Sequence, residues 1–196
     1  MTGLQRREQL LDVARLVFAE KGYDATSIEE IAKRADVSKP VVYEHFGGKE
    51  GIYQVVVHRE MQRLLARVTA SLGATHPKIM LEQAAVALLT YIEDERDGFR
   101  ILIHNSPIPA STGSFATLIG DIASQVEHIF LGEFKRRGYE PKLAPLYSHA
   151  LVGMVALVGQ WWLEAGKPSR EKVAAHLVNL AWNGLGNLEL KPKLTT

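Results

Sequence analysis

The chain contains no cysteine among its 196 residues. Disulfide bridges, thiolate nucleophiles, cysteine-ligated zinc and iron–sulfur clusters are therefore excluded. An excess of charge of one sign is lacking as well, because 23 Lys and Arg against 22 Asp and Glu give a formal net charge of +1. Net charge thus favours no class of partner, and any nucleic-acid interaction has to be argued from the local placement of side chains.

Long apolar runs are also missing. No uninterrupted apolar stretch approaches the roughly 18 to 20 residues of a membrane span, and residues 1–7 lack the apolar segment of a secretory signal. We therefore expect a cytoplasmic protein without a membrane partner. Hydrophobic residues make up 46% of the chain, which is enough to bury a core by packing alone.

Apolar residues recur at helical spacing along the whole chain, whereas no alternating strand pattern occurs. The sequence therefore predicts an all-α fold of about nine helices. Their expected ranges are about 6–21, 28–35, 39–46, 49–72, 78–95, 99–105, 114–137, 143–165 and 169–188. Residues 106–113, rich in Pro, Ser and Gly, predict a mobile loop before the seventh of these helices.

Residues 26–46 have the build of a helix-turn-helix, in which two short helices meet at a tight turn. Glu29 and Glu30 each lie three residues after a capping residue, Thr26 and Ser27 respectively. At the turn, Asp36 tolerates a left-handed backbone conformation, and Ser38 is expected to cap the second helix. Ala32 is small where the helices cross, and we expect Ile31 and Val37 to fill the core beneath the turn. The exposed face of the second helix can then enter a DNA major groove.

The run 26–52 resembles the TetR family of bacterial transcriptional repressors. The matching residues are Thr26, Ile31, Ala32, Val37, Ser38, Tyr43, Phe46 and Lys49. The resemblance implies an N-terminal three-helix helix-turn-helix DNA-binding domain in residues 1–48, joined to a larger helical effector-binding and dimerisation domain in residues 49–196. It also implies a repressor that binds a palindromic double-stranded DNA operator as a homodimer and is released by a small, mainly apolar effector.

Carried over residue by residue, the resemblance assigns two groups of DNA-binding side chains. Phosphate contacts fall to Thr26, Ser27, Tyr43, His45 and Lys49, and base contacts fall to Lys39, Pro40 and Val41. Tyr43 has a rival interpretation as a half-buried core aromatic, and Lys49 as a solvated surface lysine. The sequence departs from the family pattern at Asp36, where Gly is frequent, and at residues 40–42, where Pro and Val replace Gly and hydroxyl-bearing residues. The second departure makes the groove-facing surface more apolar and favours contact with thymine methyl groups.

The last two predicted helices each carry an apolar stripe with small residues that permit close helix approach. The expected dimer-interface residues are Leu146, Ala150, Gly153, Leu157, Leu177, Leu180, Ala181 and Gly184. The family dimerises through its last two helices, and the resulting two-fold axis would place the recognition helices about 34 to 36 Å apart. The alternative interpretation is that these stripes belong to the core of a single chain.

A set of aromatic and apolar residues with a few polar groups has the composition of a small-molecule pocket. The candidate effector-binding residues are Phe99, Ile103, His104, Phe115, Ile122, Gln125, Phe130, Trp161 and Trp162. Aromatic residues at helical spacing are also common in ordinary cores, so this alternative stays open.

Two other classes of protein compete with a regulator. An enzyme is disfavoured because the sequence contains no Glu-x-x-His or His-Glu-x-x-His pair, no Gly-rich phosphate loop and no Gly-x-Ser-x-Gly elbow. We therefore expect no catalytic residue, no metal and no cofactor. A helical carrier or interaction module without DNA binding would leave Tyr43, Lys49 and the capped turn without a purpose. The sequence does not identify the effector, the operator or the regulated genes, nor does it decide between repression and activation.

Overall fold

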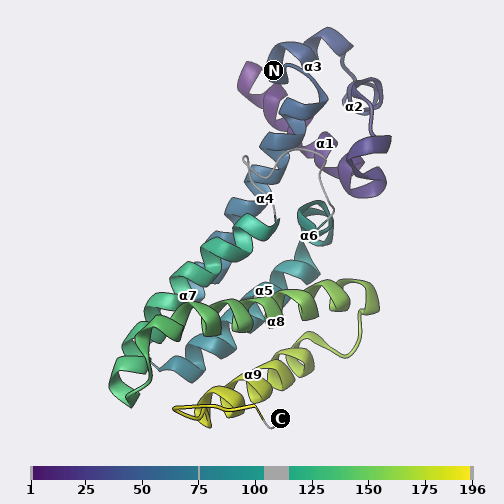
Figure 1. The fold of residues 1–196 in the computed structure, drawn as a ribbon. Helices are drawn as coiled ribbons and strands as arrows, with labels where there is room; N and C mark the ends of the chain where they lie inside the picture. The colour runs from purple at the N-terminus through teal and green to yellow at the C-terminus, as the bar shows by residue number, and fades with distance from the viewer. Residues whose placement is uncertain (1, 75, 104–114, 195–196) are drawn as a thin grey trace. The chain divides into compact units, whose positions relative to one another are not determined.

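The computed structural model describes residues 2–74, 76–103 and 115–194, and within these ranges all regular structure is helical (Figure 1). The elements are α1 Gly3–Ala25, α2 Ile28–Arg34, α3 Lys39–Phe46, α4 Lys49–Ser71, α5 Pro77–Asp94, α6 Arg96–Ile103, α7 Phe115–Arg137, the 3-10 turn η2 Pro141–Leu143, α8 Ala144–Ala165 and α9 Arg170–Gly186. The all-α prediction is confirmed. His104 and the loop predicted at residues 106–113 lie outside the described residues.

The chain divides into two compact units. The N-terminal unit contains residues 1–63 and 95–117, and the C-terminal unit contains residues 64–94 and 118–196. This division differs from the expected boundary between residues 48 and 49, because α6 packs against α1 and so returns to the N-terminal unit. Sequence periodicity does not indicate which distant helix a short helix will join.

Helix α1 begins earlier than the periodicity predicted. Thr2 is its N-cap and forms a capping box with Gln5, in which each side chain bonds the backbone N–H of the other residue. Gly22 interrupts the helix with φ +74° and ψ 176°, which confirms the stop expected there. Only glycine adopts this backbone conformation at small cost.

The core of the N-terminal unit forms where α1, α2 and α3 meet. Ile31 is fully buried and Ala32 is 2% exposed, as the helix-turn-helix pattern predicts. Val42, which was expected on the groove-facing surface, is also fully buried, because its side of α3 faces the core. Val37 departs from the prediction because it is only partly buried. From α1, the amide of Gln9 donates to the carbonyl of Ala35 and so satisfies an acceptor at the end of α2.

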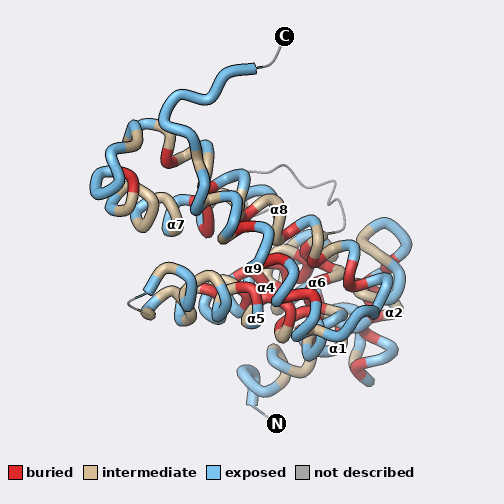
Figure 2. The backbone as a smooth tube through the Cα atoms, turned by 90° about the horizontal axis from the view of Figure 1, so that it is seen from below, coloured by how far each residue is buried: buried red, intermediate tan, exposed pale blue. Residues whose placement is uncertain are grey.

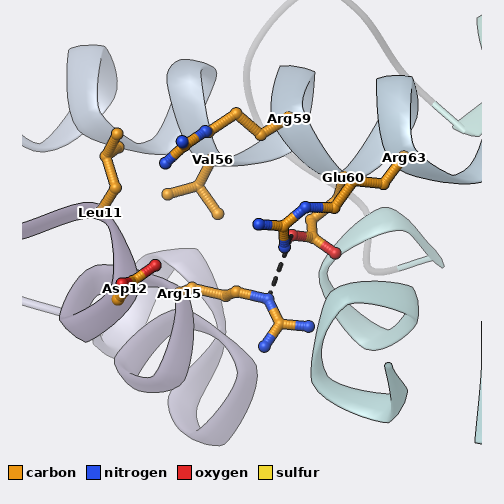
Figure 3. Close-up of a pocket in the computed structure, with 7 residues that line it drawn as sticks. All are labelled: Leu11, Asp12, Arg15, Val56, Arg59, Glu60 and Arg63. Carbon is orange, nitrogen blue, oxygen red and sulfur yellow. Dashed lines mark hydrogen bonds and ion pairs between the residues drawn. The ribbon is translucent and has the colours of Figure 1, made fainter. Parts of the chain in front are cut away.

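A buried ion network joins α1, α4 and α6. Glu60 of α4 is 1% exposed, and its carboxylate accepts from Arg15 Nε at 3.1 Å and from Arg63 at 2.8 Å (Figure 3). Arg15 also pairs with Glu95, which directly precedes α6. A Cβ added at Gly98 would lie 1.8 Å from Glu60 Oε2, so only glycine allows α6 to approach the carboxylate this closely.

Helix α6 begins at Arg96 rather than at the predicted residue 99. Asp97 therefore lies in the first turn of the helix. Near the network, a cavity of about 10 Å³ is lined by Leu11, Asp12, Arg15, Val56, Arg59, Glu60 and Arg63 (Figure 3). This volume accommodates about one water molecule, so the cavity is too small for an organic effector.

In the C-terminal unit, α9 packs along α5, and the end of α7 is tied to the end of α9. The Arg137 guanidinium donates to the carbonyls of Leu185 and Gly186 at 3.1 and 2.9 Å. These bonds satisfy carbonyls that the last turn of a helix leaves without an intrahelical donor. The segment after α9 is exposed apart from Leu188, which is partly buried (Figure 2).

Candidate nucleic-acid interface

The turn between α2 and α3 is held by backbone bonds. Asp36 adopts the expected left-handed conformation, with φ +54°, and the N–H of Val37 donates to the carbonyl of Ala32 at 3.0 Å. Ser38 occupies the N-cap position of α3, as predicted, but its side chain forms no capping hydrogen bond. The angle between the two short helices is therefore set by the backbone of the turn and by the buried residues beneath it.

Helix α3 presents one face to solvent. Val42 is its only buried residue, whereas Lys39, Pro40, Tyr43 and Glu44 are exposed. Residues 39 and 43, like 40 and 44, are four positions apart and therefore lie on the same side of a helix. Tyr43 is 53% exposed, so about half of its side chain is accessible to a duplex.

The C-terminal end of α3 is anchored. Gly47 ends the helix in the left-handed conformation with φ +72°, and its N–H donates to the carbonyl of Tyr43 at 2.7 Å. Phe46 is partly buried, and the guanidinium of Arg7 lies 5.0 Å from the centre of its ring. His45 and Val41 are partly exposed. The first turn and the solvent-facing side of α3 are thus the parts of this helix that a duplex can reach.

Thr26 and Ser27 have different roles. Ser27 is the N-cap of α2 and its hydroxyl accepts from the N–H of Glu30 at 3.2 Å. Thr26 is 3% exposed, and its hydroxyl donates to the carbonyl of Gly22. The expected phosphate contact through the Thr26 side chain does not agree with this burial. Thr26 instead links the end of α1 to the start of α2.

Lys49 is also engaged within the chain. Its Nζ donates to the carbonyl of Asp24 at 3.0 Å and lies 4.4 Å from the centre of the Tyr23 ring. It is therefore not a freely solvated lysine in this structure. A phosphate contact by Lys49 would require its ammonium group to leave these partners, or to share its remaining donors with the phosphate.

An ion pair crosses the turn and involves a predicted base-contacting residue. Lys39 Nζ lies 2.8 Å from Glu29 Oε2, and the two side chains are 53% and 72% exposed. The hydrogen bond and positive charge of Lys39 lower the pKa of the Glu29 carboxyl below its usual value. The capping pattern explains Glu29 only as a residue at the start of a helix and does not predict this pair. The signal was present, since opposite charges occupy the first turns of two helices that meet at a tight turn.

The candidate effector residues are divided between the two units. In the N-terminal unit, Phe99 is fully buried and its ring meets Phe115 edge-to-face at 5.9 Å, while Ile103 is partly buried. In the C-terminal unit, Ile122 is buried and Phe130 is partly buried.

Three residues of the predicted pocket have other surroundings. Gln125 is exposed, and Trp161 is 55% exposed. The indole N–H of the buried Trp162 donates to the carbonyl of Pro168 at 2.7 Å. Consecutive residues on a helix point about 100° apart, so Trp161 and Trp162 cannot both face one pocket. Spacing alone did not reveal which of them faces solvent.

The predicted dimer stripe is exposed on α8. Leu146 is 62% and Leu157 65% exposed, Ala150 is exposed, and Gly153 is partly exposed. Trp161 continues the same side of the helix.

On α9 the prediction needs correction. Leu180 is 63% exposed and Gly184 is exposed, whereas Leu177 and Ala181 are 6% and 7% exposed. These two belong to the core because α9 packs its apolar side against α5.

Comparisons with known proteins agree with this architecture. Residues 10–56 match the family model described as bacterial regulatory proteins, tetR family, and residues 67–194 match the model of a tetracyclin repressor-like C-terminal domain. The chain is 30% identical over 188 residues to the transcriptional activator FasR of Mycolicibacterium smegmatis, covering 95% of this chain and 85% of FasR. It is 29% identical over 174 residues to the transcriptional repressor BepR of Brucella suis, covering 83% of each protein.

A solved structure gives the same result for the fold. A TetR-like transcriptional regulator from Rhodococcus sp. RHA1 superimposes with a TM-score of 0.77 at 26% identity, covering 93% of this chain and 97% of that protein. The two family models together match well over half of the sequence. Such proteins are ligand-responsive regulators rather than enzymes. The chain belongs to the TetR family of bacterial transcriptional regulators.

Proposed function

We propose that this protein is a cytoplasmic repressor that binds a near-palindromic operator as a homodimer and is released by a small, mainly apolar effector. The observation that carries the proposal is the exposed face of α3. Lys39, Pro40 and Tyr43 are exposed on this helix, whereas Val42 is buried in the core. Residues 1–48 would contact DNA and residues 49–196 would bind the effector and the second copy. A repressor of this kind needs only to occupy promoter DNA.

The surface of α8 supports dimerisation. Residues 141–165 are long and apolar enough to cross a membrane by length and composition alone. An 18-residue window of this segment has a mean hydropathy of 1.3, yet only 28% of the window is buried. Exposed apolar patches of this kind mark interaction sites. A second copy related by a two-fold axis would cover Leu146, Leu157 and Trp161 of α8 together with Leu180 of α9. The same axis would present two copies of α3 to one duplex.

Tyr43 provides a direct test of the DNA interface. We expect Tyr43→Ala to weaken operator binding by about tenfold or more, because a hydrogen bond to a charged phosphate contributes about 1.5 to 3 kcal/mol. Since the ring is 53% exposed, the melting temperature should change little. Tyr43→Phe separates the hydroxyl from the ring, and Tyr147→Phe in α8 is the matched control. Fluorescence anisotropy with DNA flanking the protein's own gene measures the affinity.

The same measurement of DNA affinity tests a second expectation for the interface, namely its sequence specificity and salt dependence. Wild-type binding should be sequence-specific and should weaken steeply as salt rises, because lysine contacts neutralise phosphates and displace their counterions. Equal affinity for random duplex, or no binding at low salt, would contradict the proposed function. A Tyr43→Ala variant that unfolds would show that the ring is structural.

Activation is the second candidate function, and the similarity to FasR, an activator, favours it. The exposed face of α3 is compatible with either sign of regulation. An in vitro transcription assay with the operator at its natural position decides between them. A repressor lowers transcript yield when added, whereas an activator raises it.

The effector site requires a ligand that distinguishes two arrangements of the dimer. An effector that does so typically couples to DNA binding by about 1 to 3 kcal/mol, which lowers operator affinity roughly 5- to 150-fold. Ile122 and Phe130 of the C-terminal unit are the apolar residues that we retain as its candidate contacts. Thermal-shift screening of small apolar compounds, followed by operator titration with each stabilising compound, tests this part of the proposal.

A further inference from the structure

The first turn of α3 offers one polar side chain to a duplex. Lys39 is followed by Pro40 and Val41, whose side chains neither donate nor accept hydrogen bonds. Among the first three residues of this helix, Lys39 therefore has the only side chain that can form hydrogen bonds. Its behaviour toward DNA decides whether this turn reads bases or only attracts phosphates.

Lys39 is not an isolated cation. Glu29 Oε2 lies 2.8 Å from the Lys39 ammonium nitrogen, and both side chains are exposed. The neighbouring acidic residue of α2, Glu30, forms ion pairs with Lys21 and Arg34 instead of Lys39. Glu29 thus extends across the turn to the first residue of α3. The lowered pKa of its carboxyl keeps it ionised at neutral pH.

This arrangement changes what the turn can bind. A phosphate approaching Lys39 meets a charge that is already neutralised, together with a carboxylate that repels it. A G·C base pair offers matched partners in the major groove, because guanine O6 and N7 accept from lysine and the cytosine amino group donates to a carboxylate. An exposed pair of this kind is held weakly enough to exchange its partners on binding.

We propose that Glu29 is a specificity-determining residue of the operator interface, which prevents Lys39 from acting as a general phosphate contact and directs the pair toward a G·C base pair. The inference rests on the proposed function, since it requires α3 to enter the major groove. In this role, Glu29 lowers the affinity of the protein for unrelated DNA and leaves its affinity for the operator largely unchanged.

Glu29→Gln tests the inference. The glutamine keeps the size of the side chain but releases Lys39 from its charged partner. We expect affinity for a random duplex to rise about threefold or more at 100 mM salt, and the slope of log K against log salt to steepen by about 0.9, the value for one additional phosphate contact. Operator affinity should rise less, so the ratio of specific to non-specific affinity falls.

Two further variants separate the cause from a general effect of charge. Glu8→Gln removes another exposed acid, which is paired with Arg59, and should leave the slope within error of wild type. In a Lys39→Met background, Glu29→Gln should no longer steepen the slope, because no released ammonium is present. The single variants Glu29→Gln and Glu8→Gln should have melting temperatures close to that of the wild type, since the Glu29–Lys39 and Glu8–Arg59 ion pairs lie at the surface.

The outcomes are distinguishable. If the wild type binds its operator specifically but Glu29→Gln behaves like Glu8→Gln, the role of Glu29 is refuted and the proposed function stands. The role of Glu29 is refuted in the same way if Glu29→Gln steepens the slope equally in the Lys39→Met background. If the wild type itself shows no preference for operator over random duplex, the proposed function fails and the inference fails with it.

Discussion

Gly98→Ala is expected to lower the stability of the protein by about 3 kcal/mol, which corresponds to a fall in melting temperature of about 6 to 12 °C for a chain of this size. The added methyl group would lie 1.8 Å from Glu60 Oε2 and 2.9 Å from an Arg15 guanidinium nitrogen. The carboxylate is 1% exposed and bonded to Arg15 and Arg63, so it cannot move aside without breaking those bonds. Overpacking and disruption of a buried ion pair both contribute to the loss.

A matched glycine is available as a control. Gly120 in α7 has no atom within 4 Å of an added Cβ, so Gly120→Ala should be neutral or stabilising by up to about 1 kcal/mol through helix propensity. Thermal unfolding followed by circular dichroism compares the two variants. In a Glu60→Ala background, Gly98→Ala should cost less than in the wild type, because the obstructing carboxylate is gone. Equal melting temperatures for Gly98→Ala and Gly120→Ala would show that α6 can shift at little cost.

Leu157→Asp is expected to abolish dimerisation at concentrations where the wild type is a dimer, with a rise in dissociation constant of about 100-fold or more. Leu157 is 65% exposed and lies in the middle of the α8 stripe between Leu146 and Trp161. A second copy that covers this stripe would bury the new carboxylate without a partner. Sedimentation velocity measures the oligomeric state, and operator binding should fall with the loss of the dimer.

The control replaces an exposed apolar residue on another helix. Ile79 in α5 is 45% exposed, and Ile79→Asp should leave the dimer intact. Both variants should keep their helical circular dichroism, since both residues are exposed in the single chain. Wild-type protein that sediments as a monomer, or a Leu157→Asp variant that stays dimeric, would contradict the proposed interface.

The local features of the helix-turn-helix could be predicted because they depend on near neighbours in the chain. Asp36 tolerates a left-handed conformation, Gly22 interrupts one helix and Gly47 ends another, and Ile31 and Ala32 are buried where the two short helices meet. Ser27 was likewise predictable as a cap. Each of these assignments needs only the residues within one or two helical turns.

Contacts between distant segments were not predictable from the same patterns. Lys49 looks like an available polar side chain in the sequence, but its ammonium group donates to the carbonyl of Asp24. Leu177 and Leu180 are equally apolar, yet only packing against α5 buries the first and leaves the second exposed. Periodicity defines a helical face, but the neighbouring helices decide which part of that face is covered.

The sequence by itself determined the helical class, the tight turn between α2 and α3, and the family, because short-range spacing and motif identity carry that information. Tertiary structure alone decided that Glu60 is buried between Arg15 and Gly98. Residues 60 and 98 are far apart in the chain. Only the packing of α4 and α6 brings them together, since a buried charge requires partners whose positions the whole fold fixes.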